Sequence, residues 1–502
     1  MTELASGGRQ RATSLPLVLA LTSISFFMVA LDALVVVTAL PSIHASIGGS
    51  IATLEWAVNA YGLTFASGII TAAAIGDRFG HRRVYVAGLV LFTVSSAACA
   101  LAPNASLLIT ARAVQGLGAA AVTPLALTIL ARTFPVERRG AVVGIFGGIG
   151  GLAVAGGPLV GGVVVQGLDW HWIFWINVPF GLAAAIGSVH FLPSGRGAAP
   201  ATRLDLPAVP LVAGGAAAIA WALIQVGDSG WSDPKAITGF IAGAVLLAGL
   251  VLRERRAAEP MLPLRLFKSR TFSAANAAAF CSSGAVFSAA FLTAQYFQLG
   301  LGYSPLATGL RLLPWTATPM VVAPLAGALA DRIGNRPLLV AGCVMQAAGL
   351  AWVASLAATT ASGGYGRFVL PLIIAGVGVS MTLPTAPTAV LGAVPAGDVG
   401  RASGVSNTMQ RFGGAFGIAL VTAVFAAHGH FGSAASFTSG YRPAMVVSAV
   451  ISLAGAAAAV AVGRRAAASA GAPAQVPAQA VVPSHQTTGD VAAGANIGAD
   501  AS

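Results

Sequence analysis

Two charged side chains lie deep inside long apolar stretches of the sequence. Asp32 stands within the run 15–40, and Arg112 stands within the run 107–130. If both runs are membrane helices, the carboxyl lies about 13 Å and the guanidinium about 9 Å from the same outer face, at 1.5 Å rise per residue. An ionised group at the centre of such a helix costs roughly 2.5–3.5 kcal/mol on insertion scales. We therefore expect the two groups to meet, directly or through water.

A carboxyl group beside a guanidinium can act as a proton switch. Desolvation favours the neutral acid and the nearby cation favours the carboxylate, so movement of either group or the arrival of a cation tips the balance. Asp32 could then release its proton when a substrate arrives and bind another after the substrate leaves. Gln115 lies one turn from Arg112 on the same helix face. The alternative is a fixed ion pair that only locks two helices together.

Further polar and aromatic residues within the apolar runs are candidates for a substrate pocket or its vestibule. Glu55 is interpreted either as a carboxylate of an outer vestibule or as an acid at a solvated helix start, where acids are favoured. Arg411 is interpreted either as an anchor that reaches the cytoplasmic face or as a second buried site. The other candidates are Trp56, Asn59, Tyr61, Gln115, Asn276, Gln295, Tyr296 and Trp315. For each of them, helix packing or the interfacial aromatic belt is the alternative.

The composition requires a membrane to surround these groups. Of the 502 residues, 56% are hydrophobic and 8% are charged, whereas soluble domains carry about 25% charged residues. This excludes a soluble enzyme and a disordered chain, and three cysteines exclude a disulfide scaffold. A spanning helix needs about 20 apolar residues. Fourteen such runs occur, at 15–40, 54–75, 84–101, 107–130, 141–166, 172–192, 206–226, 236–252, 272–299, 306–330, 338–358, 368–394, 404–427 and 444–462.

The placement of charge predicts the orientation of these helices. Of the 27 Lys and Arg residues, 21 fall in the two tails and in alternate loops, which is the bias of cytoplasmic segments. We therefore expect a multi-pass membrane protein with both termini in the cytoplasm. Because the net charge of +12 follows this pattern, it does not indicate a nucleic-acid partner. The 25 arginines against two lysines, with abundant Ala and Gly, indicate the codon bias of a GC-rich bacterium, so the plasma membrane is the expected location.

An internal repeat divides the chain into two halves. The segment AIGDRFGHRR at 74–83 is similar to ALADRIGNRP at 328–337, and the two aspartates lie 254 residues apart. Eight helices over 254 residues leave about 32 residues for each helix and loop, whereas six helices would leave about 42 and require a long polar loop that the sequence lacks. Two helices are therefore inserted between two six-helix bundles. We predict an all-α, polytopic membrane protein of this plan, as in many secondary transporters. The expected parts are a cytoplasmic tail (1–14), the first bundle (15–195), two linker helices (196–255), a cytoplasmic basic loop (256–271), the second bundle (272–465) and a disordered cytoplasmic tail (466–502).

Several motifs resemble the major facilitator superfamily, in particular its fourteen-helix drug:proton antiporters. The segment 31–41 (LDALVVVTALP) is similar to the pattern that ends the first helix, with Leu34 and Val37 in place of the usual Thr and Asn. Residues 112–116 match R-x-x-Q-G, and 157–162 match G-P-x-x-G-G. The segment 170–181 (WHWIFWINVPFG) resembles the start of the sixth helix, and the two repeat loops resemble the family's Asp-Arg loop.

The resemblance implies a role for two further groups of residues. The repeat loops would hold the cytoplasmic side of the protein shut. The alternative is that they only cap helices and determine topology. The residues concerned are Asp77, Arg78, Gly80, Arg82, Asp331, Arg332 and Gly334. A tightly packed hinge in the fifth helix would prevent leakage, with plain helix packing as the alternative, through Gly157, Pro158, Gly161 and Gly162.

The expected function is export of a hydrophobic, cationic or weakly basic compound in exchange for protons, with antibiotic resistance as a plausible role. The proton gradient would drive it, with no cofactor, no metal and no partner beyond substrate, protons and lipid, and we expect a monomer. One alternative is a proton symporter that imports a nutrient. Another is a membrane-embedded enzyme or sensor, which the scattered histidines and the lack of a long soluble loop disfavour. The absence of a G-x-x-x-x-G-K-[ST] motif argues against direct use of ATP.

Overall fold

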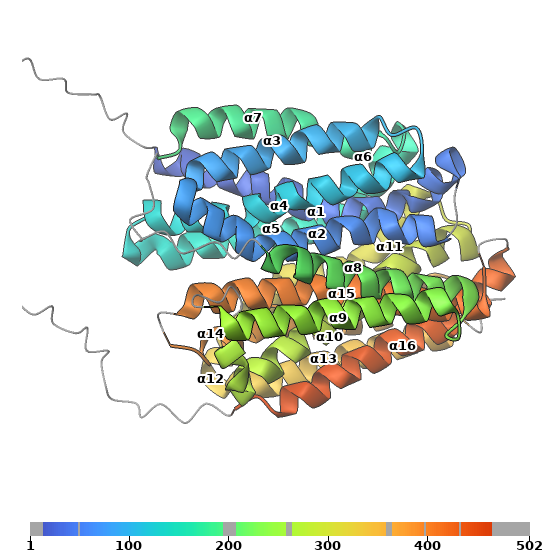
Figure 1. The fold of residues 1–502 in the computed structure, drawn as a ribbon. Coiled ribbons are helices and arrows are strands. Elements are labelled where there is room, and N and C mark those ends of the chain that lie inside the picture. The colour runs from blue at the N-terminus through green and yellow to red at the C-terminus, as the bar shows by residue number, and fades with distance from the viewer. Residues whose placement is uncertain are drawn as a thin grey trace, which may run out of the picture. The chain divides into compact units, whose positions relative to one another are not determined.

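The computed structural model describes residues 14–48, 51–193, 207–257, 264–357, 364–395, 398–430 and 433–463. Within these ranges the regular elements are helices, with no strand, and fourteen segments are long and apolar enough to cross a membrane. This confirms the predicted all-α class and helix count (Figure 1). The expected tails lie outside the described residues except for Ser14, and so do parts of the two loops that flank the inserted helices.

The first half holds α1 (Leu15–Ile47), α2 (Ile51–Phe79), α3 (His81–Ala100), α4 (Ala105–Thr133), α5 (Val136–Gly167), α6 (Trp172–Trp175) and α7 (Asn177–Phe191). The inserted pair is α8 (Ala208–Ser229) and α9 (Pro234–Arg256). The second half holds the 3-10 helix η1 (Leu264–Lys268), α10 (Arg270–Gln295), the π-helical turn η2 (Tyr296–Gly300), α11 (Pro305–Thr316), α12 (Thr318–Ile333), α13 (Asn335–Ala357), α14 (Gly366–Leu391), α15 (Val399–His428) and α16 (Ala434–Val460).

Several helices are longer than the apolar runs that predict them. The helix α1 continues past Pro41 to Ile47, and α16 begins ten residues before the run at 444. Polar and small residues interrupt the apolar ones in these extra segments, so hydropathy does not mark them, yet they still form the backbone hydrogen bonds of a helix. The Ser433 side chain caps the start of α16, because it accepts a hydrogen bond from the Ser436 amide.

Two predicted spans consist of two helices each. The run 172–192 breaks at Ile176 between α6 and α7, and the run 306–330 breaks at Ala317 between α11 and α12. At the second break Pro319 has no amide hydrogen to continue the helical ladder. The Thr318 hydroxyl donates instead to the Trp315 carbonyl, at 2.7 Å. Both residues at the breaks keep right-handed helical backbone angles, so each span still crosses as one segment.

The inserted pair packs along the side of the other helices. The helix α8 contacts both α2 of the first half and α15 of the second, and α9 packs on α8 (Figure 1). Buried apolar residues of α2, α8 and α15 form one cluster, which includes Leu63, Val212 and Phe412. The insertion therefore touches both bundles through α8.

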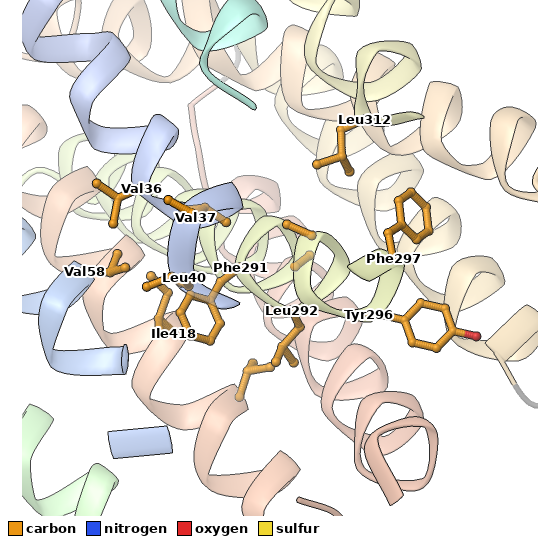
Figure 2. Packing of buried hydrophobic residues seen from close by; sticks show 14 of the residues in the cluster. Val36, Val37, Leu40, Val58, Phe291, Leu292, Tyr296, Phe297, Leu312 and Ile418 are labelled. Carbon is orange, nitrogen blue, oxygen red and sulfur yellow. The ribbon is translucent and has the colours of Figure 1, made fainter. Parts of the chain in front are cut away.

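A large apolar cluster joins the two halves at one end of the helices. It contains Val36 and Leu40 of α1, Phe291 and Leu292 of α10, and Ile418 of α15 (Figure 2). Trp170, in the turn between α5 and α6, belongs to the same cluster, and we refer to this end as the Trp170 end. The opposite end carries the turn between α2 and α3, and we refer to it as the Asp77 end.

Hydrogen bonds between the halves also lie near the Trp170 end. Gln298 Nε2 donates to the Thr38 carbonyl at 2.9 Å, and the Leu306 amide donates to Gln166 Oε1 at 3.2 Å. Deeper in the molecule, the Thr316 hydroxyl donates to the Ala155 carbonyl at 3.1 Å. These bonds link α1 and α5 to the second half, so the halves are joined closely at this end.

Toward the Asp77 end, α5 is uncovered along several of its glycines. Among the described residues, a Cβ atom added at any of them would meet nothing within 4 Å outside its own helix, and these positions are Gly144, Gly147, Gly148 and Gly151. The two halves are thus closed against each other at the Trp170 end and leave this part of α5 open.

Candidate functional site

Asp32 and Arg112 form an ion pair in the interior of the first bundle. Arg112 Nη1 lies 2.5 Å from Asp32 Oδ2, and the two side chains are 1% and 0% exposed. Gln115 Nε2 donates to the other carboxylate oxygen at 3.0 Å, and Gln115 Oε1 accepts from Arg112 Nη1 at 2.8 Å. The predicted approach of the two charges is confirmed. Because α1 extends to Ile47, the carboxyl lies near the middle of that helix rather than in its outer half.

Asn177 completes the group, and the sequence alone does not single it out. Its Nδ2 atom donates to Asp32 Oδ1 at 2.9 Å and to Ser96 Oγ at 3.1 Å. Asn177 is the first residue of α7, directly after the break at Ile176. The signal that the sequence offers is a lone amide inside the apolar motif at 170–181. Asp32 therefore receives hydrogen bonds from two helices, α4 and α7.

Arg112 connects this buried pair to α2. Its Nε atom donates to the Ala57 carbonyl at 3.1 Å, and its guanidinium lies 4.2 Å from the centre of the Tyr61 ring. The Tyr61 hydroxyl donates to the Val29 carbonyl of α1 at 3.1 Å. The carboxylate of α1, the guanidinium of α4 and the aromatic ring of α2 therefore form a continuous chain of contacts.

A small cavity lies beside this part of α2, between the two halves. Its volume is about 30 Å³, and it is bordered by residues of α1, α2, α10 and α15: Ala33, Val58, Asn59, Tyr61, Gly62, Phe287, Arg411, Gly414, Ala415 and Ile418. Two of the predicted pocket residues, Asn59 and Tyr61, are among them. Tyr61 thus touches Arg112 of the buried pair and also borders the space between the bundles.

Arg411 corrects one interpretation drawn from the sequence. The extended helix α15 places it roughly 18 Å from the helix start at 1.5 Å per residue, which is too deep for an anchor at the cytoplasmic face. Its guanidinium lies 4.3 Å from the centre of the Phe65 ring, in the middle of α2. The anchor interpretation is wrong because the apolar run at 404–427 begins five residues after the true helix start.

Glu55 is buried in the second turn of α2. Its side chain is 1% exposed, and Asn59 Nδ2 donates to its Oε1 atom at 3.5 Å. The interpretation of Glu55 as an acid at a solvated helix start is therefore wrong. In this state its carboxyl is enclosed and does not face a vestibule. Trp56 is half-buried and packs against the cluster of α2, α8 and α15.

The structure does not bring the pocket candidates of the second half to this cavity. Tyr296 stacks on Tyr441, with ring centres 4.2 Å apart, and Trp315 belongs to the apolar cluster at the Trp170 end. Asn276 and Gln295 donate to carbonyl groups one turn earlier in α10, at 2.9 and 3.4 Å. All four are buried, and their role in a substrate pocket stays a prediction.

The first repeat loop holds its ion pairs within the first bundle. Asp77 Oδ1 lies 2.9 Å from His81 Nε2 and 3.7 Å from Arg132 Nη2. Arg82 Nη1 donates to the Leu192 carbonyl at 3.0 Å, and the exposed Arg78 lies over the Phe79 ring. The gate role predicted for these residues stays a prediction, since each of these contacts joins parts of one bundle.

Glycine is required at the turn of both repeat loops. Gly80 and Gly334 have φ angles of 100° and 86°, a region that residues with a Cβ atom rarely adopt. Asp331 and Arg332 are exposed at the end of α12, just before the second of these turns. The two copies of the repeat therefore share the same turn.

The glycines of α5 allow close approach to two helices. A Cβ atom on Gly161 would collide with Thr38 of α1, and one on Gly157 would lie 2.8 Å from the Leu34 Cβ atom. Gly162 faces the other way, against the backbone of Pro305 in α11, and Gly309 of α11 lies against the Pro158 carbonyl. The face of α5 that carries Gly162 joins the two bundles, as a hinge that closes one end would require. The hinge role itself stays a prediction.

Comparison with known proteins agrees with this architecture. The sequence profile of the Major Facilitator Superfamily matches residues 22–418 and, in an overlapping match, 321–491. The chain belongs to the Major Facilitator Superfamily. This is a superfamily of membrane transporters, so the enzyme and sensor alternatives do not apply.

Relatives in the superfamily cover most of the chain. The tetracenomycin C resistance and export protein of Streptomyces glaucescens is 34% identical over 405 residues, which is 80% of this chain and 74% of that one. The cephamycin export protein CmcT of Amycolatopsis lactamdurans is 33% identical over 459 residues, 89% and 93% of the two chains. A crystal structure of the peptide transporter POT in complex with sulfate has a TM-score of 0.64 at 18% identity, covering 90% and 95%. This last likeness shows the fold alone.

Proposed function

We propose that this protein is a proton-coupled exporter of small hydrophobic compounds in the plasma membrane of a bacterium. The proposal is supported by membership of the superfamily and by relatives that are named for export of, or resistance to, antibiotics. It is further supported by an ionisable pair that is fully enclosed in the first bundle. We propose that the protein works as a monomer, because each half already contributes helices to one central cavity.

The distribution of basic residues supports an orientation for this exporter. Arginines gather in the turns of the Asp77 end, among them Arg78, Arg83 and Arg332, and such segments stay in the cytoplasm. With the Asp77 end inside, both termini are cytoplasmic. The halves are closed at the opposite end. They are also joined on the α2–α15 flank, where the Thr408 hydroxyl donates to the Ala66 carbonyl at 3.2 Å, so cargo from the cytoplasm would have to enter on the α5 flank.

The single observation that carries proton coupling is the set of hydrogen bonds around Asp32. Arg112, Gln115 and Asn177 all donate to a carboxylate that is 0% exposed. Protonation would remove the charge that holds the guanidinium, and charge-assisted hydrogen bonds are about twice as strong as neutral ones. Arg112 would then be free to move relative to Asp32 while still touching α2.

Arg112 also offers a route from the cavity to the carboxyl. It contacts Ala57 and Tyr61 of α2, and Val58 and Tyr61 border the cavity. Cargo that displaces this wall of α2 would change the distance between Arg112 and Asp32. In the outward-facing state Asp32 takes up a proton as cargo leaves. In the inward-facing state it releases the proton to the cytoplasm as new cargo binds. One proton enters and one cargo molecule leaves in each such exchange.

Uptake into everted membrane vesicles tests this proposal. An imposed pH gradient, acid inside the vesicle, should drive a dye that the protein exports into wild-type vesicles and should leave Asp32→Asn vesicles about a hundredfold slower, the range of a lost proton-transfer group. Asp169→Asn is the matched control, because this acid lies half-exposed in the turn at the Trp170 end. Equal rates for wild type and Asp32→Asn would overturn the coupling role.

Two further outcomes separate the alternatives. If the pair only locks α1 to α4, Arg112→Ala should lose folded protein, because an unpaired buried charge costs about 3–5 kcal/mol, while Asp32→Asn that remains folded should still transport. If the protein imports a nutrient, the same gradient should drive the compound out of everted vesicles. Size-exclusion profiles of fluorescent fusions measure the folded fraction.

A further inference from the structure

Arg411 carries the one charge among the described residues that border the cavity between the halves. It projects from the middle of α15, opposite the middle of α2. The other lining residues are apolar or small apart from Asn59 and Tyr61, and they include Val58 and Ile418, which are labelled in Figure 2. The cavity therefore presents a cation, an amide and an aromatic ring to whatever enters it.

No carboxylate in the described part of the chain forms a salt bridge with Arg411. On the facing helices, Asp32 of α1 is held by Arg112, and Glu55 of α2 accepts from Asn59 without bordering the cavity. The charged residue of α10 is Arg270, at the start of that helix, and Arg401 lies near the start of α15. Asp77 of α2 lies near the end of that helix and pairs with His81. None of these acids therefore forms an ion pair with Arg411, and its guanidinium instead contacts the face of the Phe65 ring.

A second polar atom at the cavity has unused capacity. Asn59 Oδ1 is buried without a hydrogen-bond donor, while its Nδ2 atom is directed to Glu55. Buried acceptors are costly unless a donor reaches them. The wall thus combines a free cation with a free acceptor, and a group that carries a negative oxygen beside an O–H or N–H donor satisfies both.

We propose that Arg411 binds the acidic group of the cargo and that Asn59 accepts a hydrogen bond from a neighbouring donor of the same molecule. The cargo class is therefore an acid that carries an O–H or N–H donor beside its negative oxygen. This inference rests on the proposed export function and names its substrate class, which departs from the cationic cargo expected from the sequence. The cavity of about 30 Å³ has the room of about one water molecule, so the two halves have to separate further before the cargo reaches Arg411 and Asn59.

Arg411 also has a purely structural alternative, in which its contact with Phe65 only joins α15 to α2. Such a latch would affect every ligand alike, whereas an anion site discriminates by charge. The pair 3-hydroxy-2-naphthoate and its methyl ester separates the two roles, because both share the hydroxyl and the ring system and only the acid carries a charge.

Equilibrium dialysis against the full-length protein in nanodiscs measures the binding of both probes, with empty nanodiscs as the blank. Wild type should bind the acid more tightly than the ester. Arg411→Gln should raise the dissociation constant of the acid by about tenfold or more, as expected for the loss of a hydrogen bond to a charged group. The dissociation constant of the ester should not change. Arg411→Lys should keep most of the preference, and Arg401→Gln, the control, should keep all of it.

Binding of the ester by Arg411→Gln shows that this variant is folded. The proposal is overturned if wild type does not prefer the acid, or if Arg411→Gln weakens both probes equally. Asp32→Asn should retain the preference while losing pH-driven uptake. If wild type prefers the acid but shows no uptake in everted vesicles, the export function fails and the anion site stands. If everted vesicles take up dyes but the protein binds acid and ester equally, the export function stands and the anion site is wrong.

Discussion

Gly162 of α5 lies directly against the backbone of Pro305 at the start of α11, so two helices from different bundles meet without a side chain between them. Nearby, Gly309 of α11 lies against Pro158 in the same way. Backbones approach this closely only where both faces carry small residues. The joined Trp170 end therefore depends on individual glycines.

The first prediction concerns that contact. Gly162→Ala places a methyl group into the Pro305 carbonyl, and such overpacking costs about 1–3 kcal/mol. We expect export in vesicles to fall about tenfold, since the state closed at the Trp170 end loses stability relative to the open one. Gly148→Ala on the same helix meets nothing within 4 Å and should export like wild type. Equal activity of the two variants would contradict the closure role.

The second prediction concerns Asn177, which donates to both Asp32 and Ser96. A hydrogen bond to a charged group contributes about 1.5–3 kcal/mol, so Asn177→Ala should lower the unfolding temperature in detergent and slow export. Asn407→Ala serves as the control, because this exposed amide donates to a carbonyl of its own helix. A thermal unfolding scan and a vesicle assay on both variants decide it. An unchanged midpoint and rate in Asn177→Ala would show that the amide is dispensable.

The third prediction concerns the acid of the first repeat loop. Asp77 and Arg132 are both about half-exposed, and ion pairs of this kind contribute about 0–1 kcal/mol. Asp77 also contacts the buried His81 at 2.9 Å, so we expect Asp77→Ala to lower the unfolding temperature slightly. Export should fall by much more than this loss of stability explains, since the main effect would appear in the state closed at the Asp77 end. If export stays at the wild-type rate, the loop acts only as a turn and a topology signal.

The fourth prediction concerns orientation. A fluorescent protein fused after residue 502 should fluoresce, because this fold matures in the cytoplasm and not after export through the Sec pathway. A cysteine at Asn104, exposed in the turn between α3 and α4, should react with a membrane-impermeant maleimide in whole cells. A cysteine at Arg332, exposed at the Asp77 end, should react only after lysis. The reverse pattern would place the protein the other way round.

Much of the architecture could be predicted from the sequence because membrane helices are marked by their length and hydropathy. The helix ends could not, since mixed segments such as 434–443, where Ser, Thr and Arg alternate with apolar residues, continue a helix without raising the mean hydropathy. This difference matters for Arg411, because the apolar run alone places it too close to the cytoplasmic end of its helix. Helix ends are set by capping and backbone hydrogen bonds, which a hydropathy window does not see.

The Asp32–Arg112 pair could be predicted from the sequence, whereas the residues that surround it could not. Asp32 and Arg112 stand out because each is a charge inside an apolar run. Asn177 and Ser96 are ordinary polar residues of α7 and α3, and only the packing of three helices brings them to the carboxylate. In the second half, Tyr296 and Trp315 have the residue types of a pocket, but residue type alone does not say which face of a helix packs inward.

The position of α8 has a consequence for how a greasy molecule reaches the interior. This helix lies over the line where α2 and α15 meet, and it blocks sideways passage from the surrounding lipid on that flank. On α5, the glycines toward the Asp77 end meet no other helix within 4 Å among the described residues. A compound dissolved in the bilayer therefore has to enter on a flank other than the one that α8 covers.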